Sequence, residues 1–311
     1  MEQYKNILVV IDPTTDDQKS LKRAIELSMR TQSVITAFLS IFDFSYEMTT
    51  MLSSDEREDM RQSVVADREL WLKNIINELP HQGISINYKV VWHNRPFEAI
   101  IEQVINKKYN LVIKATHQHD KLKSVIFTPT DWHILRKCPC PVLLVKEHRW
   151  PENGNILAAI NIGSDEAEHK SLNNKITETA NSFGQLLKGK VNLVNSYPGT
   201  PVNIAIEIPE FDASEYNDSM LKHHQKAMLT HAQHYGIATE NTFVEEGLPE
   251  TVIESTSNEL DAELVILGTI GRTGISAALI GNTAEHVIDK LNCDVLAIKP
   301  EGYISPFESK L

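Results

Sequence analysis

The stretch Asn6-Ile-Leu-Val-Val-Ile-Asp12 returns later in the chain as Asn155-Ile-Leu-Ala-Ala-Ile-Asn161, at an offset of 149 residues. A second match joins Arg95-Pro96-Phe-Glu-Ala99 to Leu248-Pro249-Glu-Thr-Val252, and from the two prolines onward an offset of 153 residues holds without a gap. That register pairs Leu111–Ile113 with Leu264–Ile266, Thr116 with Thr269, His133 with His286, Cys140 with Cys293, and Lys146 with Lys299. The chain therefore contains two copies of one module.

The copies divide the 311 residues into segments of different character. We expect a first domain over 1–147 and a second over 155–300, because both matches fall inside these ranges. The stretch 148–154 is short and polar and carries Pro and Gly, as is typical of a linker. Residues 301–311 remain as a C-terminal tail.

Each copy alternates short apolar runs with helical patterns. In the first copy the apolar runs cover 7–11, 34–42, 88–92, 111–115 and 142–146, and helical patterns cover 21–30, 55–79, 96–106 and 131–137. Nearly unbroken apolar strands that alternate with helices indicate a parallel sheet covered on both faces. The predicted fold class is α/β, with two tandem doubly wound domains.

Composition narrows the class of protein. A net charge of −12 and a pI near 5.5 disfavour a protein that neutralises nucleic-acid phosphates. No apolar run approaches the roughly 20 residues of a membrane span, and no signal peptide precedes the first strand, so we expect a cytoplasmic protein. The three cysteines, Cys138, Cys140 and Cys293, are interpreted as reduced core thiols, with a redox or metal pair at Cys138 and Cys140 as the alternative.

The most informative segment follows the apolar run 264–267. Gly268, Gly271 and Gly281 come directly after this predicted strand, and Asn282 and Thr283 then open a helix over 284–291. Glycines let the backbone approach a phosphate closely, and the free amides of a helix N-terminus point at an anion. The segment therefore predicts a phosphate-binding loop, with a simple strand-to-helix turn as the alternative.

Arg272 lies within that predicted loop. Its guanidinium could bind a terminal phosphate, and a role as an ordinary surface arginine is an equal alternative.

The spacing Gly-x2-Gly-x9-Gly followed by a small polar residue resembles the ATP-binding signature of the universal stress protein family. The stretches 43–50, 92–99 and 127–133 are also similar to tandem members of that family. The resemblance implies a five-stranded parallel sheet in each module, pairing of the modules through their last strands as a pseudo-dimer, and a cytoplasmic role in stress resistance. It also implies ATP or a related nucleotide, with Mg²⁺, as the ligand of the second domain. The implied nucleotide-binding residues are Asn161, Val194, Leu267, Gly268, Thr269, Gly271, Arg272, Gly281, Asn282 and Thr283.

The chain departs from the family pattern at several positions. The first strand of the family ends in Asp, which is present at Asp12 and replaced by Asn161 in the copy that keeps the glycines. In the first copy the 153-residue offset places Ala115, Gln118 and Thr128 where the second has glycine. We therefore expect the first domain to be structural or to bind a different ligand.

Two other segments offer alternatives. His117, His119 and Asp120 follow a predicted strand and could bind a transition metal, with solvated loop histidines as the simpler interpretation. Val202, Ile204, Ile206 and Ile208 alternate with polar residues in the insert 198–211, which could cover an apolar ligand or form a surface strand.

The sequence lacks the common catalytic signatures, including Gly-x4-Gly-Lys-Ser/Thr and Gly-x-Ser-x-Gly. Glu285 in the first turn of the last helix is explained by the helix dipole. Three hypotheses follow: a nucleotide-binding stress sensor, which is not an enzyme although slow hydrolysis stays open; a carrier of an amphiphilic ligand with a phosphate head; and a structural interaction protein without a ligand. Whether the chain dimerises further is left open.

Overall fold

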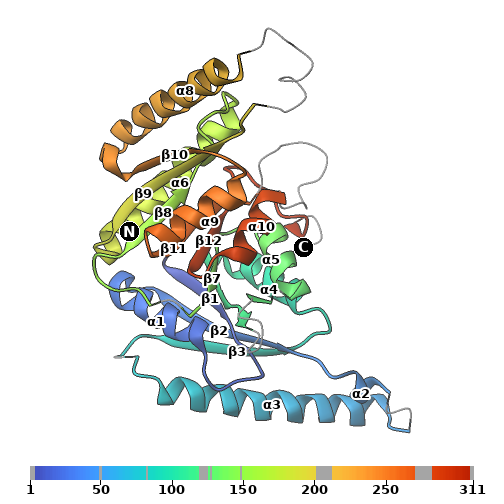
Figure 1. The fold of residues 1–311 in the computed structure, drawn as a ribbon. Coiled ribbons are helices and arrows are strands. Elements are labelled where there is room, and N and C mark those ends of the chain that lie inside the picture. Colours follow the sequence, from blue (N-terminus) through green and yellow to red (C-terminus); the bar gives the residue numbers. More distant parts are fainter. Residues whose placement is uncertain are drawn as a thin grey trace. The chain divides into compact units, whose positions relative to one another are not determined.

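The computed structural model describes residues 4–48, 51–81, 83–118, 125–126, 128–147, 149–200, 212–269 and 282–308. The chain forms two compact units. The first contains residues 1–117, 127–146 and 304–311, and the second contains residues 118–126 and 147–303. Each unit is built around five main strands that pair in parallel (Figure 1).

The first unit alternates strands and helices along the chain. Its elements are β1 (Asn6–Val10), α1 (Lys19–Thr31), β2 (Val34–Ile41), α2 (Phe44–Glu47), α3 (Ser54–Glu78), β3 (Ile86–Trp92), α4 (Pro96–Lys107), β4 (Leu111–Ala115), α5 (Pro129–Lys137) and β7 (Val142–Val145). The strands pair in parallel in the order β7-β4-β1-β2-β3. Along the chain between β4 and α5 lie two two-residue strands, β5 (His117–Gln118) and β6 (Val125–Ile126), which pair with each other, and residues 118–126 of this segment belong to the second unit.

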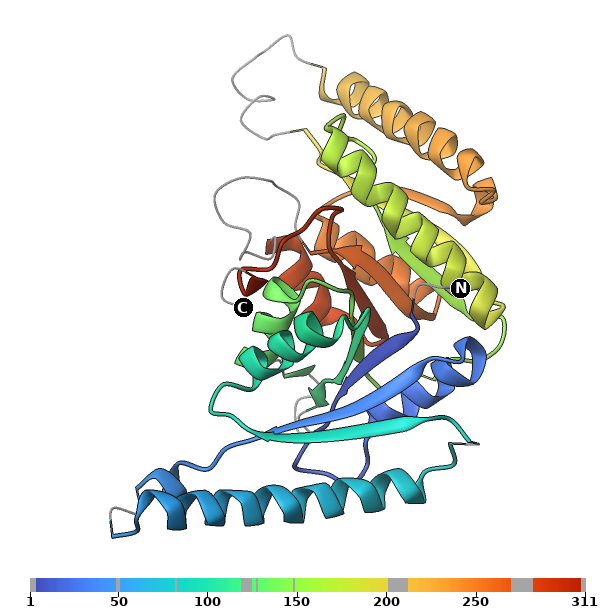
Figure 2. The same ribbon diagram turned by 180° about the vertical axis from the view of Figure 1, so that it is seen from behind.

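The second unit repeats this plan. Its elements are β8 (Asn155–Ala159), α6 (Ala167–Leu187), β9 (Lys190–Tyr197), α8 (Ala213–His234), η1 (Thr239–Asn241), β10 (Thr242–Glu246), α9 (Pro249–Glu259), β11 (Ala262–Gly268), α10 (Asn282–Lys290) and β12 (Asp294–Ile298). The strands pair in parallel in the order β10-β9-β8-β11-β12. Figure 1 looks onto α9 and α10, and Figure 2 looks onto α6 and α8 on the opposite face of the same sheet.

The prediction of two doubly wound α/β domains is confirmed. The central strands are buried on both faces, which matches their unbroken apolar sequence: β1, β4, β7, β11 and β12 are almost completely buried. Fully burying one such aliphatic side chain contributes about 1.5–3 kcal/mol.

The helix ends follow from local sequence signals. Pro96 and Pro249, the pair that starts the 153-residue register, each occupy the first turn of a helix, where a missing amide hydrogen costs nothing. α3 begins with a capping box in which Ser53 and Glu56 bond each other's backbone. Only the C-terminal half of α3 is buried, at Leu72, Ile75 and Ile76.

Two segments outside the repeats are packed into the units. Trp150, in the stretch expected to be a polar linker, is 6% exposed and meets Phe183 of α6 edge to face. The last eight residues belong to the first unit, where Phe307 is 5% exposed. Both are single aromatic anchors in otherwise polar sequence, which is why the hydrophobic pattern did not reveal them.

Candidate functional site

The order of strands in the second unit defines where a ligand fits. From β8 the chain steps outward through β9 to β10, and then returns to the other side of β8 with β11 and β12. Ligands of open parallel sheets bind beyond the carboxyl ends of the strands at such a reversal. The reversal lies between β8 and β11, so Asn161 and Gly268 stand at its two sides.

At the end of β11, the predicted residues Leu267, Gly268 and Thr269 have distinct environments. Leu267 is buried, and a β-carbon on Gly268 would lie 2.6 Å from the Leu172 side chain of α6, so this glycine permits close helix packing. The Thr269 hydroxyl donates to the Ile298 carbonyl and accepts from Lys299 Nζ at 2.7 Å. Thr269 therefore anchors the start of the glycine loop to β12.

The rest of the predicted loop is only partly covered by the structure. Gly271, Arg272 and Gly281 lie outside the described residues. Asn282 and Thr283 are the first two residues of α10, in agreement with the predicted helix start. Glu285 follows in the first turn of the same helix.

At the end of β8, Asn161 is exposed and its backbone is fixed. Asn173 of α6 accepts from the Asn161 amide at 3.0 Å and donates to its carbonyl at 2.8 Å. The Asn161 side chain itself has no hydrogen-bond partner in the described part of the chain. Its amide group is therefore available to a ligand as both donor and acceptor.

At the end of β9, the predicted residue Val194 is buried and apolar. The polar side chains at this strand end belong to Asn195 and Tyr197, which follow it in β9. Asn195 is 1% exposed, and its Oδ1 accepts from the Ile162 amide at 3.0 Å. Its Nδ2 lies 3.0 Å from Nδ1 of His224 on α8. Tyr197 stacks on the His224 ring, with the ring centroids 5.2 Å apart.

His224 belongs to this site although its sequence position did not suggest it. The ring is 5% exposed, and burial holds its pKa below the ordinary value of 6.5, with His223 as a smaller cause. Gly163, in the loop after Asn161, leaves room for it, because a β-carbon there would lie 2.2 Å from the ring. The sequence signal was this glycine, four residues after the end of β8.

Two lysines add positive charge near the end of β11. Lys175 of α6 donates to the Lys299 carbonyl at 2.9 Å, and Lys299 donates to Thr269. Burial is the larger effect and lowers the pKa of Lys175, and Glu301 acts in the opposite direction without forming an ion pair with it. These ammonium groups favour an anion at the start of the glycine loop.

The matching position in the first unit is filled by the protein itself. Asp131 in the first turn of α5 accepts from the backbone amide and the hydroxyl of Thr128, each at 2.7 Å. Its other carboxylate oxygen lies 2.6 Å from Lys114 Nζ, and Asp131 is fully buried. The helix start that would receive a phosphate thus already holds a carboxylate.

Asp12, which keeps the family's acidic residue at the end of β1, is also engaged. Its Oδ1 accepts from the amide of Thr14 at 2.9 Å and from the hydroxyl of Thr14 at 2.6 Å, which closes a turn. The sequence argument had found the missing glycines of the first unit, and the structure adds the carboxylate that takes the anion's place.

The three cysteines are reduced thiols in the structure, as the sequence predicts. Cys138 and Cys140 are buried free thiols with their Sγ atoms 3.6 Å apart, and Cys293 is also buried. The hydrogen bond with Cys138, followed by burial, raises the pKa of Cys140, which makes it a poor thiolate ligand.

For the metal and lid predictions, His119, Asp120 and the residues Val202, Ile204, Ile206 and Ile208 lie outside the described residues, as does the side chain of His117. Within the residues that the structure covers, no cluster of three or more His, Cys, Asp or Glu side chains could hold a metal ion. No helix among those residues is long and apolar enough to cross a membrane.

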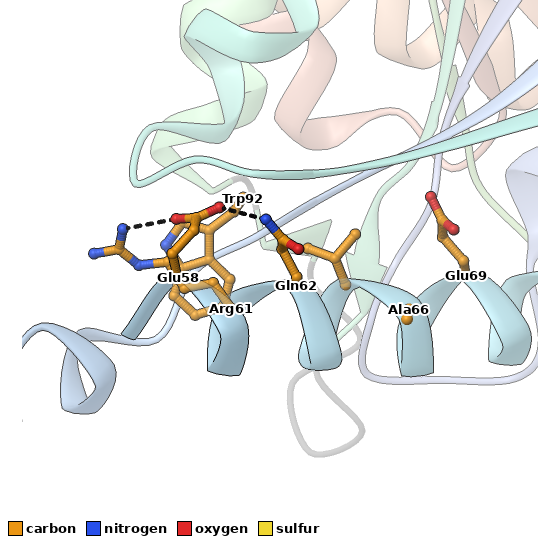
Figure 3. A pocket seen from close by; sticks show the side chains of 7 residues that line it. Glu58, Arg61, Gln62, Ala66, Glu69 and Trp92 are labelled. Carbon is orange, nitrogen blue, oxygen red and sulfur yellow. Dashed lines mark hydrogen bonds and ion pairs between the residues drawn. The ribbon is translucent and has the colours of Figure 1, made fainter. Parts of the chain in front are cut away.

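A cavity of about 380 Å³ lies in the first unit, between α3 and the end of β3 (Figure 3). Its lining includes Trp92, Gln62 and the charged side chains of Glu58, Arg61 and Glu69. Arg61 is already paired with Glu47 and Glu58. With two carboxylates and one guanidinium, the lining does not favour a polyanionic ligand.

Comparisons with known proteins agree with this architecture. The model of the universal stress protein family matches residues 3–146 and again residues 153–299. Universal stress protein E of Escherichia coli K12 is 54% identical over 309 residues, covering 99% of this chain and 98% of that protein. A universal stress protein E homolog of Haemophilus influenzae is 44% identical over 96% of this chain and 98% of that protein.

Solved structures show the same two-unit fold. The crystal structure of a functionally unknown protein from Pseudomonas aeruginosa PAO1 matches with a TM-score of 0.74 and 31% identity, covering 96% of this chain and 93% of that one. A universal stress protein from Archaeoglobus fulgidus matches with a TM-score of 0.59 and 14% identity, covering 95% of this chain and 96% of that one, which shows a shared fold. With two family domains and this level of identity over almost its whole length, the chain belongs to the universal stress protein family, as a member of the tandem two-domain type.

Proposed function

We propose that this stress-response protein binds ATP or a related nucleotide through its second unit and acts as a sensor or regulator, not as a catalyst. The observation that carries the proposal is that a polar side chain beyond the end of a strand is free in the second unit, whereas the polar groups at this edge of the first unit are already engaged. In the second unit Asn161 is exposed with a free amide, whereas in the first unit Asp131 closes the helix start. A polyanion is therefore accommodated in one unit and repelled in the other.

The chemistry of the second site supports a nucleotide. The phosphates would lie on the glycine loop and the start of α10, where helix amides and the ammonium groups of Lys175 and Lys299 favour negative charge. The Asn161 amide would bond a ribose hydroxyl or the base. Mg²⁺ would enter with the phosphates, because it binds phosphate oxygens and water more readily than an all-protein cage.

A regulatory role follows from what the site supplies. Asn161 replaces a carboxylate and so removes a candidate base, and Thr269 and Lys299 bond each other within the fold. Nucleotide occupancy would then be the signal that reaches protein partners. The buried free thiols fit a reducing, cytoplasmic location.

The test is calorimetry with ATP and Mg²⁺ on protein that has been unfolded and refolded to remove co-purified ligand. We expect saturable binding of about one ATP per chain, weakened at least about tenfold in Gly271→Val and Gly281→Val. Gln118→Val, at the position of the first unit that matches Gly271, is the control and should bind like wild type.

Other outcomes would redirect the assignment. Folded, stripped protein that binds no nucleotide contradicts the proposal. Mass spectrometry of a solvent extract then separates the two remaining hypotheses, because an amphiphilic ligand carrier would release a lipid and a ligand-free interaction protein would release none. Phosphate release during the titration measures any slow hydrolysis.

A further inference from the structure

The second unit has a polar cluster at its strand ends that the first unit lacks. Asn195, His224 and Tyr197 are buried together beside the loop that follows Asn161. The strand pairing places Leu39 and Ile41 of β2 at the positions of Asn195 and Tyr197. A buried polar cluster costs desolvation free energy that the apolar version avoids, so its presence in one unit only calls for a function.

The hydrogen bonds determine which nitrogen of His224 carries the proton. Asn195 Oδ1 must be the acceptor for the Ile162 amide, so the group facing His224 is the Nδ2 donor. His224 Nδ1 must therefore be an acceptor, and the neutral ring carries its hydrogen on Nε2. A protonated ring would place two donors against each other.

His224 Nε2–H is then a donor without a hydrogen-bond partner among the described residues, on a side chain that is 5% exposed. The edge of the ring that carries it lies over Gly163, 2.9 Å from where a β-carbon would stand. Gly163 is itself exposed and follows Asn161 by two residues. The free donor thus belongs to the wall beside the exposed amide of Asn161.

We infer that His224, oriented by Asn195, donates a hydrogen bond to the base end of the bound nucleotide, through an uncharged acceptor such as a purine ring nitrogen. This inference rests on the proposed nucleotide binding by the second unit. It adds a named contact for the base next to Asn161, which the proposed function already sets against the ribose or the base. It also favours a ligand with a hydrogen-bonding head at this end over one with an acyl chain there.

The groups that surround His224 keep it neutral. His223 lies next to it on α8, Tyr197 stacks on it from β9, and Glu246 and Asp218 act on Tyr197 by raising its pKa after the larger effect of burial. Asp165, in the loop after β8, interacts with His223 and is paired with Lys170. No carboxylate among the described residues pairs directly with His224.

The experiment compares ATP with inorganic triphosphate as probes. His224→Phe keeps a ring against Tyr197 and removes both nitrogens, and we expect it to weaken ATP binding about 5- to 10-fold while the triphosphate affinity stays unchanged. His133→Phe, which alters a stacked histidine of α5 in the first unit, is the control and should change neither affinity.

A second variant tests the orientation itself. Asn195→Asp is nearly isosteric and turns the Nδ2 donor into an acceptor, so His224 Nδ1 must carry a proton. Nitrogen-15 NMR of the histidine rings should report an Nε2–H tautomer in wild type, and an Nδ1–H or doubly protonated ring in Asn195→Asp.

Each result decides the inference. Unchanged ATP affinity in His224→Phe overturns it, and so does an equal loss for both probes, which would mean a structural role. An Nδ1–H tautomer in wild type also overturns it. If wild type binds no ATP at all, the proposed function fails first, and the NMR result still establishes or rejects the donor at Nε2.

Discussion

At the residue scale, matched positions of the two units carry opposite chemistry. Lys114 and Asp131 of the first unit correspond, at the 153-residue offset, to Leu267 and Ala284 of the second. The charged pair and the apolar pair are all buried, at 9% exposure or less. The same backbone positions thus hold an ion pair in one unit and apolar packing in the other, and only the first unit has a buried carboxylate at this position of the helix start.

The ion pair predicts a non-additive effect on stability. Lys114→Leu leaves the Asp131 carboxylate buried without its cation, so we expect a loss of about 3–5 kcal/mol in the free energy of unfolding. Lys114→Leu combined with Asp131→Ala reproduces the content of the second unit and should recover most of that loss, apart from the capping bonds to Thr128. Urea denaturation of the single and double variants measures the difference. A single variant that costs less than about 1 kcal/mol would contradict this description of the pair.

At the element scale, the C-terminal segment completes the helical layer of the first unit. Phe307 meets Phe97 of α4 edge to face at 6.3 Å, and Lys137 of α5 lies over both rings. The Ser305 hydroxyl donates to the Lys137 carbonyl at 2.6 Å, where α5 ends. The carbonyl at the end of α5 thus receives a hydrogen bond, and Phe307 contacts both helices, through the Phe97 ring of α4 and the Lys137 ammonium of α5.

This packing predicts that the tail stabilises α4 and α5. We expect Phe307→Ala to cost about 3 kcal/mol in the free energy of unfolding of the first unit, as for a buried aromatic side chain. Amide exchange should accelerate in α4 and α5 and stay unchanged in α9 and α10. Phe44→Ala, which removes a 63% exposed ring of α2, is the matched control and should be nearly neutral. Equal exchange rates in wild type and Phe307→Ala would show that the tail does not hold these helices.

At the scale of the whole molecule, one buried and two half-buried histidines make the free energy of unfolding depend on pH in both units. Burial is the largest cause that lowers the pKa of His133, His224 and His231 below the ordinary value of 6.5. Between the folded pKa and 6.5, such a histidine binds fewer protons in the folded state than in the unfolded state. The contribution of such a histidine to the free energy of unfolding is therefore complete above about pH 6.5, and it is lost as the pH falls through the pKa of the folded state.

We accordingly expect the melting temperature to fall as the pH is lowered from about 7.5 to about 5. The fall should become smaller in His133→Phe, His224→Phe and His231→Phe, each measured alone. His286→Phe is the control, because His286 corresponds to His133 in the repeat and is exposed. A fall that is the same in all four variants would assign the pH dependence to other groups, such as the carboxylates.

The elements could be predicted because their causes are local. The expected strand 111–115 is β4 residue for residue, and the expected helix 96–106 differs from α4 by one residue. Proline at a helix start, unbroken apolar strands and alternating helices are properties of neighbouring residues. The four-residue α2 was missed because it buries no residue and leaves no apolar pattern.

The residues of the candidate site could be predicted only where they follow from the order of elements along the chain. Asn161 lies two residues beyond the end of β8, and α10 begins at Asn282, so both could be located from the pattern of elements along the chain. Parallel strands bring such ends to one edge of the sheet. His224, Lys175 and Asp131 were missed, since each is defined by a partner on another element. His224 meets Asn195 at a separation of 29 residues, and Lys175 meets Lys299 at a separation of 124.

The sequence by itself determined the duplication, the α/β class of each module, and which module keeps the glycines, because these depend on spacing and apolar periodicity along the chain. Only the tertiary structure decided that Asp131 closes the first module, that Lys175 and Lys299 lie at the end of β11, and that Asn195 fixes the proton of His224. Contacts of that kind depend on distances between atoms of different elements, and those distances are set when the helices pack on the sheet.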